Sequence, residues 1–595
     1  MSSTPAQPHH PEPAHPGADQ PALAHSGTDQ PGLAGTREPQ LTELVTSAAD
    51  QAAEALGTAA PVDPPPPGDT RTDTAPAPRA TVAPARVGGD PARTAGIALG
   101  DVLPAPMDVR PDPGADFTLT ADTAIGAAPA ARDAAEQLAA LLRPATGHPL
   151  PVVTDPTAGR VTLALADPGL GPEGYRLEIT PARVRLTAAT PAGLGHGVQT
   201  LRQLLPAAVE APTPVPARWV LPGGTITDRP RYAYRGAMLD VARHFFGVPD
   251  VLRVVDHLAR YKLNHLHLHL TDDQGWRIAV DAWPRLATVG GATQVGGGPG
   301  GWYSQADYRR IVGYAARRHV TVVPEIDLPG HVNAALTAYG RLAPDGVAPP
   351  PYTGTEVGFS HLDPARESTY AFVADVLGEV AALTPGPYLH IGGDEAFKVP
   401  ADAYAGFVDR AQRIVADTGK TVLGWHQIAP AAHQPGRVLQ YWGREATDPV
   451  VADAVRRGAK LVMSPADRTY LDMRYAPDDP FGHDWAGAID VHRAYDWDPA
   501  GYLTDVPAEA VLGVAAPLWT EYVTSRDELE RMLLPRLPAI AELGWSPRSG
   551  HDWAGFRRRL AGQAARWDTA GVGYHRSPEV PWPTGTAPAP RTPVD

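Results

Sequence analysis

Short apolar segments alternate with helical patterns from residue 232 to about residue 570, and this alternation restricts the fold more than any other feature of the sequence. The segments have the pattern of β-strands and begin near Tyr234, Asn264, Thr321, Tyr388, Thr421, Arg437, Lys460 and Val511. Between most of them, apolar residues recur at helical spacing, at 251–262, 305–317, 366–382 and 401–417. The connection between the fifth and sixth segments is short, and 470–510 has the character of a long loop.

Eight strands alternating with helices predict an α/β protein with a (β/α)8 TIM barrel, which we place at residues 229–570. An open, doubly wound sheet is the alternative with a similar order of elements. In that fold a Gly-x-Gly-x-x-Gly turn typically joins a strand to a helix. No such turn joins a predicted strand of this region to its following helix, so the barrel is the favoured fold.

The predicted strand ends carry an unusual number of acids and tryptophans. In a barrel of this kind, the residues at the C-terminal ends of the strands converge on one mouth. Tryptophan faces stack on pyranose rings, while carboxylates and arginine hold hydroxyl groups through paired hydrogen bonds. These strand ends therefore predict a sugar-binding pocket; in chain order they supply Asp240, Arg243, Asp272, Asp273, Asp327, His331, Asp394, Glu395, Trp425, Trp442, Tyr470, Asp472, Trp519 and Glu521.

Residues 388–397 read Tyr-Leu-His-Ile-Gly-Gly-Asp-Glu-Ala-Phe and are the most informative part of the chain. The apolar run fits a buried strand, and Gly392 and Gly393 allow a ligand or another backbone to approach closely where it ends. Asp394 and Glu395 follow side by side. Carboxylates are costly to bury unpaired, so this pair is either solvated in a strand–helix turn or held in place for chemistry.

The sequence outside the barrel divides into three parts. Residues 1–100 are rich in Pro, Ala, Gly, Thr and Asp and contain no aromatic residue, a composition that predicts a disordered segment. Residues 571–595 form a proline-rich tail. We expect 101–228 to be a small α+β domain without an evident catalytic cluster, with strands at 117–120, 161–165, 175–179 and 184–187 and helices at 131–142 and 193–205.

Composition excludes several classes of partner. The net charge of -15 argues against binding to nucleic acid, which needs clustered positive charge. The chain has no cysteine, so disulfides and thiolate metal sites are excluded. No apolar stretch reaches membrane-spanning length, and residues 1–30 lack the apolar core of a signal peptide. We therefore expect a cytoplasmic protein with no membrane partner, while secretion by another route and the oligomeric state stay open.

The strand-end segments resemble the β-N-acetylhexosaminidases, glycoside hydrolase family 20. The resemblance covers about 117–570 in family order, and its most specific part is His390-Ile-Gly-Gly-Asp394-Glu395. The end of the predicted small domain, 192–205, also matches the domain that precedes the family's barrel. The remaining matches are Arg235-Gly-Ala-Met-Leu-Asp-Val-Ala-Arg243-His-Phe, His267-Leu-His-Leu-Thr-Asp272-Asp, Pro324-Glu-Ile-Asp327-Leu-Pro-Gly-His331, Gly424-Trp425, Tyr470-Leu-Asp472 and Trp519-Thr-Glu521.

The resemblance implies a retaining exo-glycosidase that needs no cofactor or metal and releases terminal β-linked N-acetylhexosamine, GlcNAc or GalNAc, from an oligosaccharide or glycoconjugate. An ordinary retaining enzyme places two carboxylates on opposite sides of the anomeric carbon, ~5–5.5 Å apart. Adjacent side chains at a strand end diverge and fit that arrangement poorly. In the family, the substrate's own 2-acetamido oxygen attacks instead and forms an oxazoline-type intermediate. Glu395 would be the general acid and base, and Asp394 would orient the acetamido group.

The resemblance also implies roles for the remaining candidates. Tyr470 would donate a hydrogen bond to the acetamido oxygen, and Arg243 would bind ring hydroxyls together with Asp472 and Glu521. Asp272 and His331 would tune Glu395. The walls of the pocket would be Trp425, Trp442 and Trp519. Chitin oligosaccharides, glycan termini and peptidoglycan fragments all end in the same sugar, so the physiological substrate stays open.

Other interpretations fit individual residues. Arg243 fits a surface arginine, Asp272 a turn cap and His331 a satisfied buried histidine; any of the three tryptophans fits a core position, and Tyr470 and Asp472 lie in a loop of uncertain register. A metal-dependent barrel hydrolase is a rival function, because His265, His267 and His269 alternate along one strand and face one side. A non-catalytic sugar-binding protein is a third possibility, although binding alone does not require both Asp394 and Glu395.

Overall fold

The computed structural model describes residues 97–432 and 434–584. The predicted disordered segment therefore lies outside the described residues, except for 97–100, where Leu99 is already buried. At the other end, 585–595 of the predicted tail also lie outside. Residues 571–584 pack on the barrel domain: Val572 and Val580 are buried, and the ring of Trp582 lies 6.1 Å from that of Trp567.

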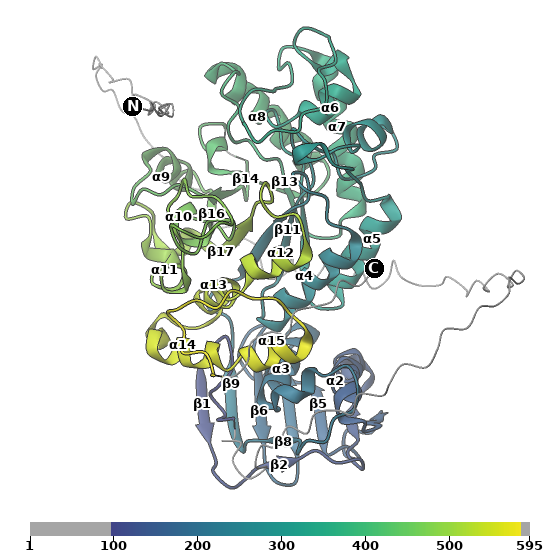
Figure 1. The fold of residues 1–595 in the computed structure, drawn as a ribbon, viewed down its shortest axis with the longest axis vertical. Helices are drawn as coiled ribbons and strands as arrows, with labels where there is room; N and C mark the ends of the chain where they lie inside the picture. Colours follow the sequence, from purple (N-terminus) through teal and green to yellow (C-terminus); the bar gives the residue numbers. More distant parts are fainter. Residues whose placement is uncertain (1–96, 433, 585–595) are drawn as a thin grey trace, which may run out of the picture.

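Eight parallel strands close into a barrel, which forms the upper part of Figure 1. The first strand pairs in parallel with the eighth, so the sheet has no free edge. The (β/α)8 expectation is confirmed, and the open sheet is wrong. Each strand begins within one residue of its predicted start; the strands are β10 (Tyr234–Asp240), β11 (His265–His269), β12 (Thr321–Glu325), β13 (Tyr388–His390), β14 (Thr421–Trp425), β15 (Val438–Tyr441), β16 (Lys460–Met463) and β17 (Val511–Leu518).

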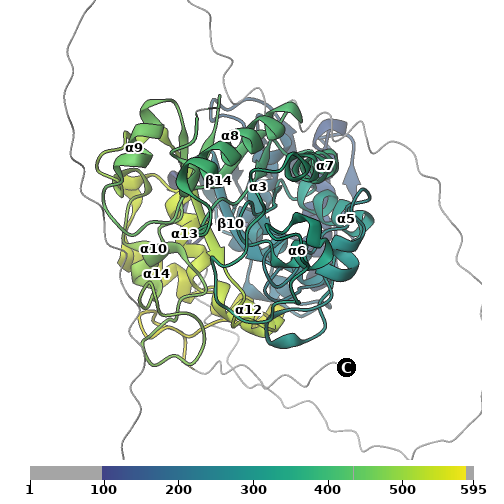
Figure 2. The same ribbon diagram turned by 90° about the horizontal axis from the view of Figure 1, so that it is seen from above.

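Helices cover the outside of the barrel, as the view from above shows (Figure 2). Local signals fix several of their starts: Ser304 and Asp307 form a capping box at one, and the Asp448 side chain caps another. The short connection after β14 holds η6 (His426–Ile428), and the expected long loop at 470–510 includes three short helical segments. The helices are α4 (Val248–Arg260), α5 (Gln305–Ala316), α6 (Asn333–Ala338), α7 (Glu367–Leu383), α8 (Ala401–Asp417), α9 (Pro449–Arg456), α10 (Ala466–Thr469), α11 (Val491–Tyr495), α12 (Arg526–Leu533), α13 (Arg536–Trp545), α14 (Trp553–Ala561) and α15 (Ala564–Ala570).

The small domain is built on a seven-stranded mixed sheet in the order β1-β9-β6-β7-β5-β3-β4, packed against two helices. The strands predicted at 175–179 and 184–187 pair as an antiparallel hairpin, closed by reciprocal hydrogen bonds between Thr180 and Arg183. Five strands of this domain were not predicted. Four of them have only two to four residues, too few for a period-two pattern, and the fifth, Gly224–Asp228, alternates in burial but was missed. The elements are β1 (Asp108–Pro111), β2 (Phe117–Thr118), β3 (Ile125–Ala127), α2 (Arg132–Thr146), β4 (Val152–Val153), β5 (Val161–Leu165), β6 (Tyr175–Ile179), β7 (Val184–Ala188), α3 (Pro191–Leu204), β8 (Val220–Leu221) and β9 (Gly224–Asp228), where β2 pairs only with β8.

A buried ionic network attaches the small domain to the end of the barrel where the strands begin. The Lys262 ammonium group, just before β11, donates to the Asp228 carboxylate and to the Tyr175 hydroxyl, both at 2.9 Å. All three side chains are fully buried. Nearby, Arg235 of β10 donates to Glu173 of the small domain at 2.6 Å. The small domain therefore supports the barrel from the face opposite the mouth, as Figure 1 shows.

Replacement of Lys262 by methionine should destabilise the folded protein strongly, because the Asp228 carboxylate would stay buried without its cation. Breaking a buried ion pair from one side costs about 3–5 kcal/mol. The free energy of unfolding from a denaturant titration measures this loss. The double variant Lys262→Met with Asp228→Asn should lose less, since no bare charge is left behind. A single variant within about 1 kcal/mol of the wild type would contradict the assigned role of the pair.

Among the residues that the structure describes, no helix combines the length and the apolar character that a membrane span requires.

Candidate active site

The predicted site residues meet at the C-terminal ends of the barrel strands. The acid pair follows β13, and its position depends on the two glycines before it. A side chain on Gly392 would meet the Asp327 carboxylate at 1.7 Å, and one on Gly393 would meet Ile428 at 2.4 Å. Both glycines have positive φ, and so does Glu395 itself, at 48°. Because such a conformation is costly for a non-glycine residue, it is typical of a position held for function.

The two adjacent acids differ in environment. The Asp394 side chain is 10% exposed, whereas the Glu395 side chain is 24% exposed at the mouth. Burial raises the pKa of Asp394 above its ordinary value, and the nearby charge of His331 offsets only part of this rise. Burial and then the charge of Asp394 raise the pKa of Asp327 well above its ordinary value. Asp327 and Asp394 are therefore two interacting buried acids, and the charge of each disfavours the ionised form of the other.

A histidine connects Glu395 to a second buried acid. His331 Nε2 lies 3.4 Å from Glu395 Oε2 and 3.7 Å from Asp394 Oδ2. Its Nδ1 lies 3.3 Å from Asp272 Oδ1. Burial lowers the pKa of His331, but the charges of Asp272 and Asp394 outweigh it and hold that pKa well above its ordinary value. His331 is thus a charged imidazolium between Asp272 on one side and the acid pair on the other.

Arg243 occupies the opposite side of the same group of acids. Its guanidinium forms an ion pair with Asp272 Oδ2 at 2.9 Å and lies 4.8 Å from the ring of Trp519. Its charge, against the effect of burial, helps to hold the pKa of Asp272 well below the ordinary value. Arg243 is 4% exposed, so it is a buried site residue and not the surface arginine of the alternative interpretation.

Aromatic side chains form the wall of the site. Trp425 is fully buried, and its ring lies 5.7 Å from that of Trp519. The Tyr470 ring lies 6.4 Å from Trp519, and Trp442 joins the group through Trp485, 6.1 Å away. Burial, followed by the charges of Asp472 and Asp394, raises the pKa of Tyr470 well above its ordinary value. Its hydroxyl is therefore a neutral hydrogen-bond donor beside Asp394.

Two further acids line the end of the site near Arg243. Glu521 Oε1 lies 3.9 Å from Arg243 Nη1, and Glu521 Oε2 lies 3.2 Å from His483 Nε2. Burial raises the pKa of Glu521, but the Arg243 charge and His483 lower it to about 2. Burial raises the pKa of Asp472 to about 7. Within the described chain, Asp394 Oδ1, Asp472 Oδ2 and Arg243 Nε are buried without a hydrogen-bond partner, an arrangement that suits the polar groups of a ligand.

The structure brings every predicted site residue to this one end of the barrel. It also adds residues to which the sequence analysis gave no role. His483 and Trp485 lie in the 470–510 segment, which carries no strand or helix period to fix their direction. Asp327 appeared among the strand-end acids without a function. Its signal was the acid pair Glu325 and Asp327 two residues apart, directly after an apolar strand.

The histidines of β11 do not share one environment. His267 and His269 both lie against Glu325, whereas His265 stacks on Tyr234 at 3.9 Å, nearer the start of the barrel. Four groups of three His, Asp or Glu side chains in the described chain are close enough to surround a cation. In each group, however, histidine nitrogens and carboxylate oxygens lie at hydrogen-bonding or ion-pair distance from one another. These contacts explain the arrangement as a proton-linked network.

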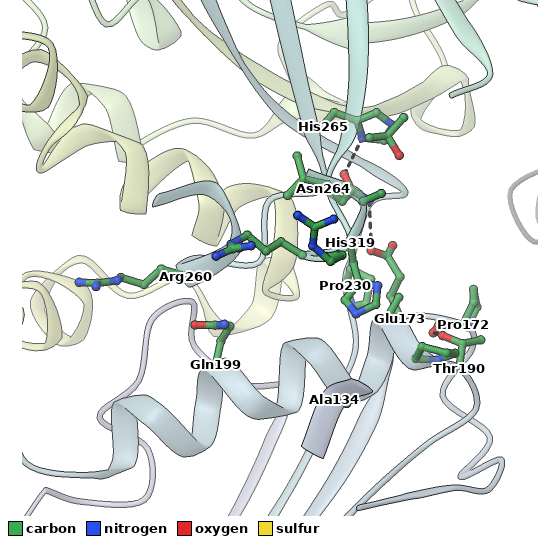
Figure 3. Close-up of a pocket in the computed structure, with 18 of the residues that line it drawn as sticks. Ala134, Pro172, Glu173, Thr190, Gln199, Pro230, Arg260, Asn264, His265 and His319 are labelled. Atoms are coloured by element: carbon green, nitrogen blue, oxygen red, sulfur yellow. Dashed lines mark hydrogen bonds between the residues drawn. The ribbon is translucent and has the colours of Figure 1, made fainter. Parts of the chain in front are cut away.

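A large cavity of about 1920 Å³ lies at the opposite end of the barrel, between the barrel and the small domain. Figure 3 shows its wall, where the Asn264 side chain is hydrogen-bonded to His265 and to Glu173. None of the predicted site residues lines this cavity. We place the active site at the other end, because the partly exposed acid, the unpaired polar atoms and the aromatic wall lie there together.

A closed parallel barrel with paired acids and an aromatic wall at its mouth defines a glycoside hydrolase. Comparison with known proteins gives the same class. The model of the glycosyl hydrolase family 20 catalytic domain matches residues 232–548, and the model of domain 2 of that family matches 100–229. The chain belongs to glycosyl hydrolase family 20.

Individual relatives extend this result over most of the chain. A β-N-acetylhexosaminidase from Cellulomonas fimi is 44% identical over 494 residues, which are 82% of this chain and 98% of that protein. The N-acetyl-β-hexosaminidase of Streptomyces plicatus, solved with thio-NAglucal, is 57% identical with a TM-score of 0.80, over 82% of this chain and 98% of that one. The family 20 enzyme of Streptomyces coelicolor A3(2) is 56% identical with a TM-score of 0.79, covering 82% and 99%.

Proposed function

We propose that this chain is a β-N-acetylhexosaminidase that releases terminal β-linked GlcNAc or GalNAc from oligosaccharides and glycoconjugates. It is a retaining enzyme, and the 2-acetamido group of the substrate is the nucleophile. The family supports this activity, as do the relatives: a Streptomyces plicatus variant was solved with GlcNAc as its product. Chitin oligosaccharides are one substrate class with the required terminal sugar.

The observation that carries the mechanism is the adjacency of Asp394 and Glu395. A retaining enzyme with its own nucleophile needs two carboxylates opposed across the anomeric carbon. Here the two acids follow one another on a turn, one buried beside Asp327 and His331, the other facing the mouth. Only Glu395 is placed to meet the leaving oxygen, so the attacking atom comes from the substrate.

The reaction then has two balanced steps. In the first, the acetamido oxygen forms a bond to the anomeric carbon, the glycosidic carbon–oxygen bond breaks, and the leaving oxygen takes a proton from Glu395. In the second, Glu395 takes a proton from water, whose oxygen attacks the anomeric carbon and opens the oxazoline-type ring. Two inversions give net retention. The His331 imidazolium, 3.4 Å from Glu395, stabilises the carboxylate that exists between the two steps.

Asp394 and Tyr470 act on the acetamido group itself. Asp394 accepts the N–H, which orients the oxygen towards the anomeric carbon and stabilises the positive charge of the cyclised group. The neutral Tyr470 hydroxyl donates to the acetamido oxygen, and Trp425, Trp442 and Trp519 surround the sugar and its methyl group. Arg243, Asp472 and Glu521 bind the ring hydroxyls, since each presents a polar atom at the other end of the site.

Asp394→Asn should lower kcat by about 10²–10³-fold, the usual cost of losing one preorganised electrostatic group at the developing charge. KM should change much less, because the anion matters most in the transition state. Steady-state kinetics on a nitrophenyl N-acetylglucosaminide, with product analysis on β-linked GlcNAc and GalNAc glycosides, measures both the mechanism and the activity. A covalent glycosyl ester trapped on Asp394 would contradict the assignment, and so would a panel from which no N-acetylhexosamine is released.

A further inference from the structure

A single buried carboxylate organises the interior of the barrel below the acid pair. Glu325 is the last residue of β12 and is fully buried. Four nitrogen atoms from three other strands lie within 3.0 Å of its two oxygens. His267 Nε2 and His269 Nδ1 lie 2.8 and 2.6 Å from Oε2, and Trp425 Nε1 and His390 Nδ1 lie 2.9 and 3.0 Å from Oε1.

Among these groups, His269 differs because both of its ring nitrogens face carboxylates. Its Nδ1 contacts Glu325, and its Nε2 lies 2.9 Å from Asp272 Oδ2. A neutral imidazole has one proton for these two acceptors, so only the imidazolium satisfies both. Burial lowers the pKa of His269, but the Glu325 charge and both hydrogen bonds raise it well above its ordinary value. His269 is therefore a buried cation held by Glu325.

The contacts continue from His269 to the catalytic acid. Asp272 Oδ2 lies 2.9 Å from His269 Nε2 and 2.9 Å from the Arg243 guanidinium. Asp272 Oδ1 lies 3.3 Å from His331 Nδ1, and His331 Nε2 lies 3.4 Å from Glu395 Oε2. The charges alternate along this line: Glu325 negative, His269 positive, Asp272 negative, His331 positive. The same carboxylate of Glu325 also fixes the indole of Trp425, which forms part of the wall.

We propose that Glu325 and His269 are positioning residues for catalysis, which keep Asp272 ionised and oriented so that the His331 imidazolium stays at ion-pair distance from Glu395. This inference rests on the acid role of Glu395 proposed above. Without Glu325, the buried His269 cation is uncompensated and loses a proton. Without the His269 cation, Arg243 is the remaining partner of Asp272 Oδ2. Asp272 is then less firmly oriented, and its contact with His331 weakens. Groups that orient a reacting residue from behind typically change function by about 10–100-fold.

The test compares two histidines of the same strand. His269→Gln removes the cation from the series of contacts His269–Asp272–His331–Glu395. His267→Gln removes a contact to the same Glu325 oxygen. The other nitrogen of His267, Nδ1, has no partner within the described chain, so His267 is not linked through it to Glu395. Glu325→Gln removes the charge with little change of shape. Each variant is assayed on a β-linked disaccharide of N-acetylglucosamine, whose leaving group needs a proton, and on the dinitrophenyl glycoside, whose leaving group does not.

We expect His269→Gln and Glu325→Gln to lower kcat/KM, which reports the step in which the leaving group departs, by about 10–100-fold on the disaccharide and by much less on the dinitrophenyl glycoside. His267→Gln should change kcat/KM by the same factor on both substrates, whatever its effect on the melting temperature. Equal losses on both substrates in His269→Gln and Glu325→Gln, while Glu395→Gln still discriminates between them, would overturn the positioning role alone. A Glu395→Gln variant that does not discriminate would instead remove the proposed acid and this inference with it.

The wild-type protein supplies a measurement that needs no folded variant. In protein labelled with ¹⁵N-histidine at about pH 8.5, two units above the ordinary histidine pKa, buried imidazolium rings that do not titrate should persist. His269 and His331 are the rings expected to give them. A spectrum in which every histidine is neutral at that pH would overturn the proposal.

Discussion

Replacement of Glu395 by glutamine should lower kcat by about 10²–10⁴-fold on substrates whose leaving group needs a proton, the usual contribution of general acid–base catalysis. The amide keeps the size of the side chain but cannot donate or accept the transferred proton. Binding should change little, because Glu395 meets the leaving oxygen and not the ring hydroxyls. Steady-state kinetics on a chitin disaccharide measures the loss.

A nitrophenyl glycoside provides the control for this variant. Its leaving group departs with little protonation, so the first step should lose much less than on the disaccharide. The second step still needs a base to activate water, and a burst of nitrophenol is therefore expected before a slow steady state. Equal losses on both substrates, without a burst, would remove Glu395 from the acid role.

The barrel could be predicted in detail because its strands are buried on both sides. Such strands appear as compact apolar runs, and helical spacing between them leaves few alternative folds. The small domain was predicted less completely. β3 and β4 have three and two residues and no alternation, so no local pattern places them in the sheet: β3 is placed by pairing with β5, and β4 by pairing with β3.

The composition of the site could also be predicted, because strand ends in a barrel converge whatever lies between them. What the sequence could not give is the order of contacts within the site. Asp272 and His331 are 59 positions apart, and their 3.3 Å contact depends on the turn that gives His331 a φ of 54°. His269 looked like a metal ligand by its alternation, and only its two carboxylate neighbours identify it as a buried cation.

The exposed aromatic residues of the 470–510 segment illustrate the same limit. Trp485 is 45% exposed, yet its ring lies 5.8 Å from that of Tyr470 and 6.1 Å from that of Trp442. No periodic pattern places a side chain in such a loop. Its position follows from packing against the wall of the site, which is a property of the folded chain.

The 2-acetamido group of the substrate should be indispensable, and its removal should have the largest effect of all. A β-glucoside with a 2-hydroxyl has no internal nucleophile, and it leaves Asp394 and Tyr470 without their partners in a buried, aromatic-walled site. Sites built to hydrogen-bond one particular group reject analogues that lack it by about 10⁴–10⁵-fold. A stable thiazoline that mimics the cyclised intermediate should inhibit strongly, because it presents the charge and shape of that intermediate already formed.

The most direct test of the account is therefore kcat/KM for two nitrophenyl glycosides that differ only at the 2-position, the glucoside and the N-acetylglucosaminide. Substrate assistance predicts that the N-acetylglucosaminide is better by about 10⁴-fold or more and that the thiazoline inhibits its hydrolysis. Comparable kcat/KM values for the two glycosides, with no inhibition by the thiazoline, would contradict it.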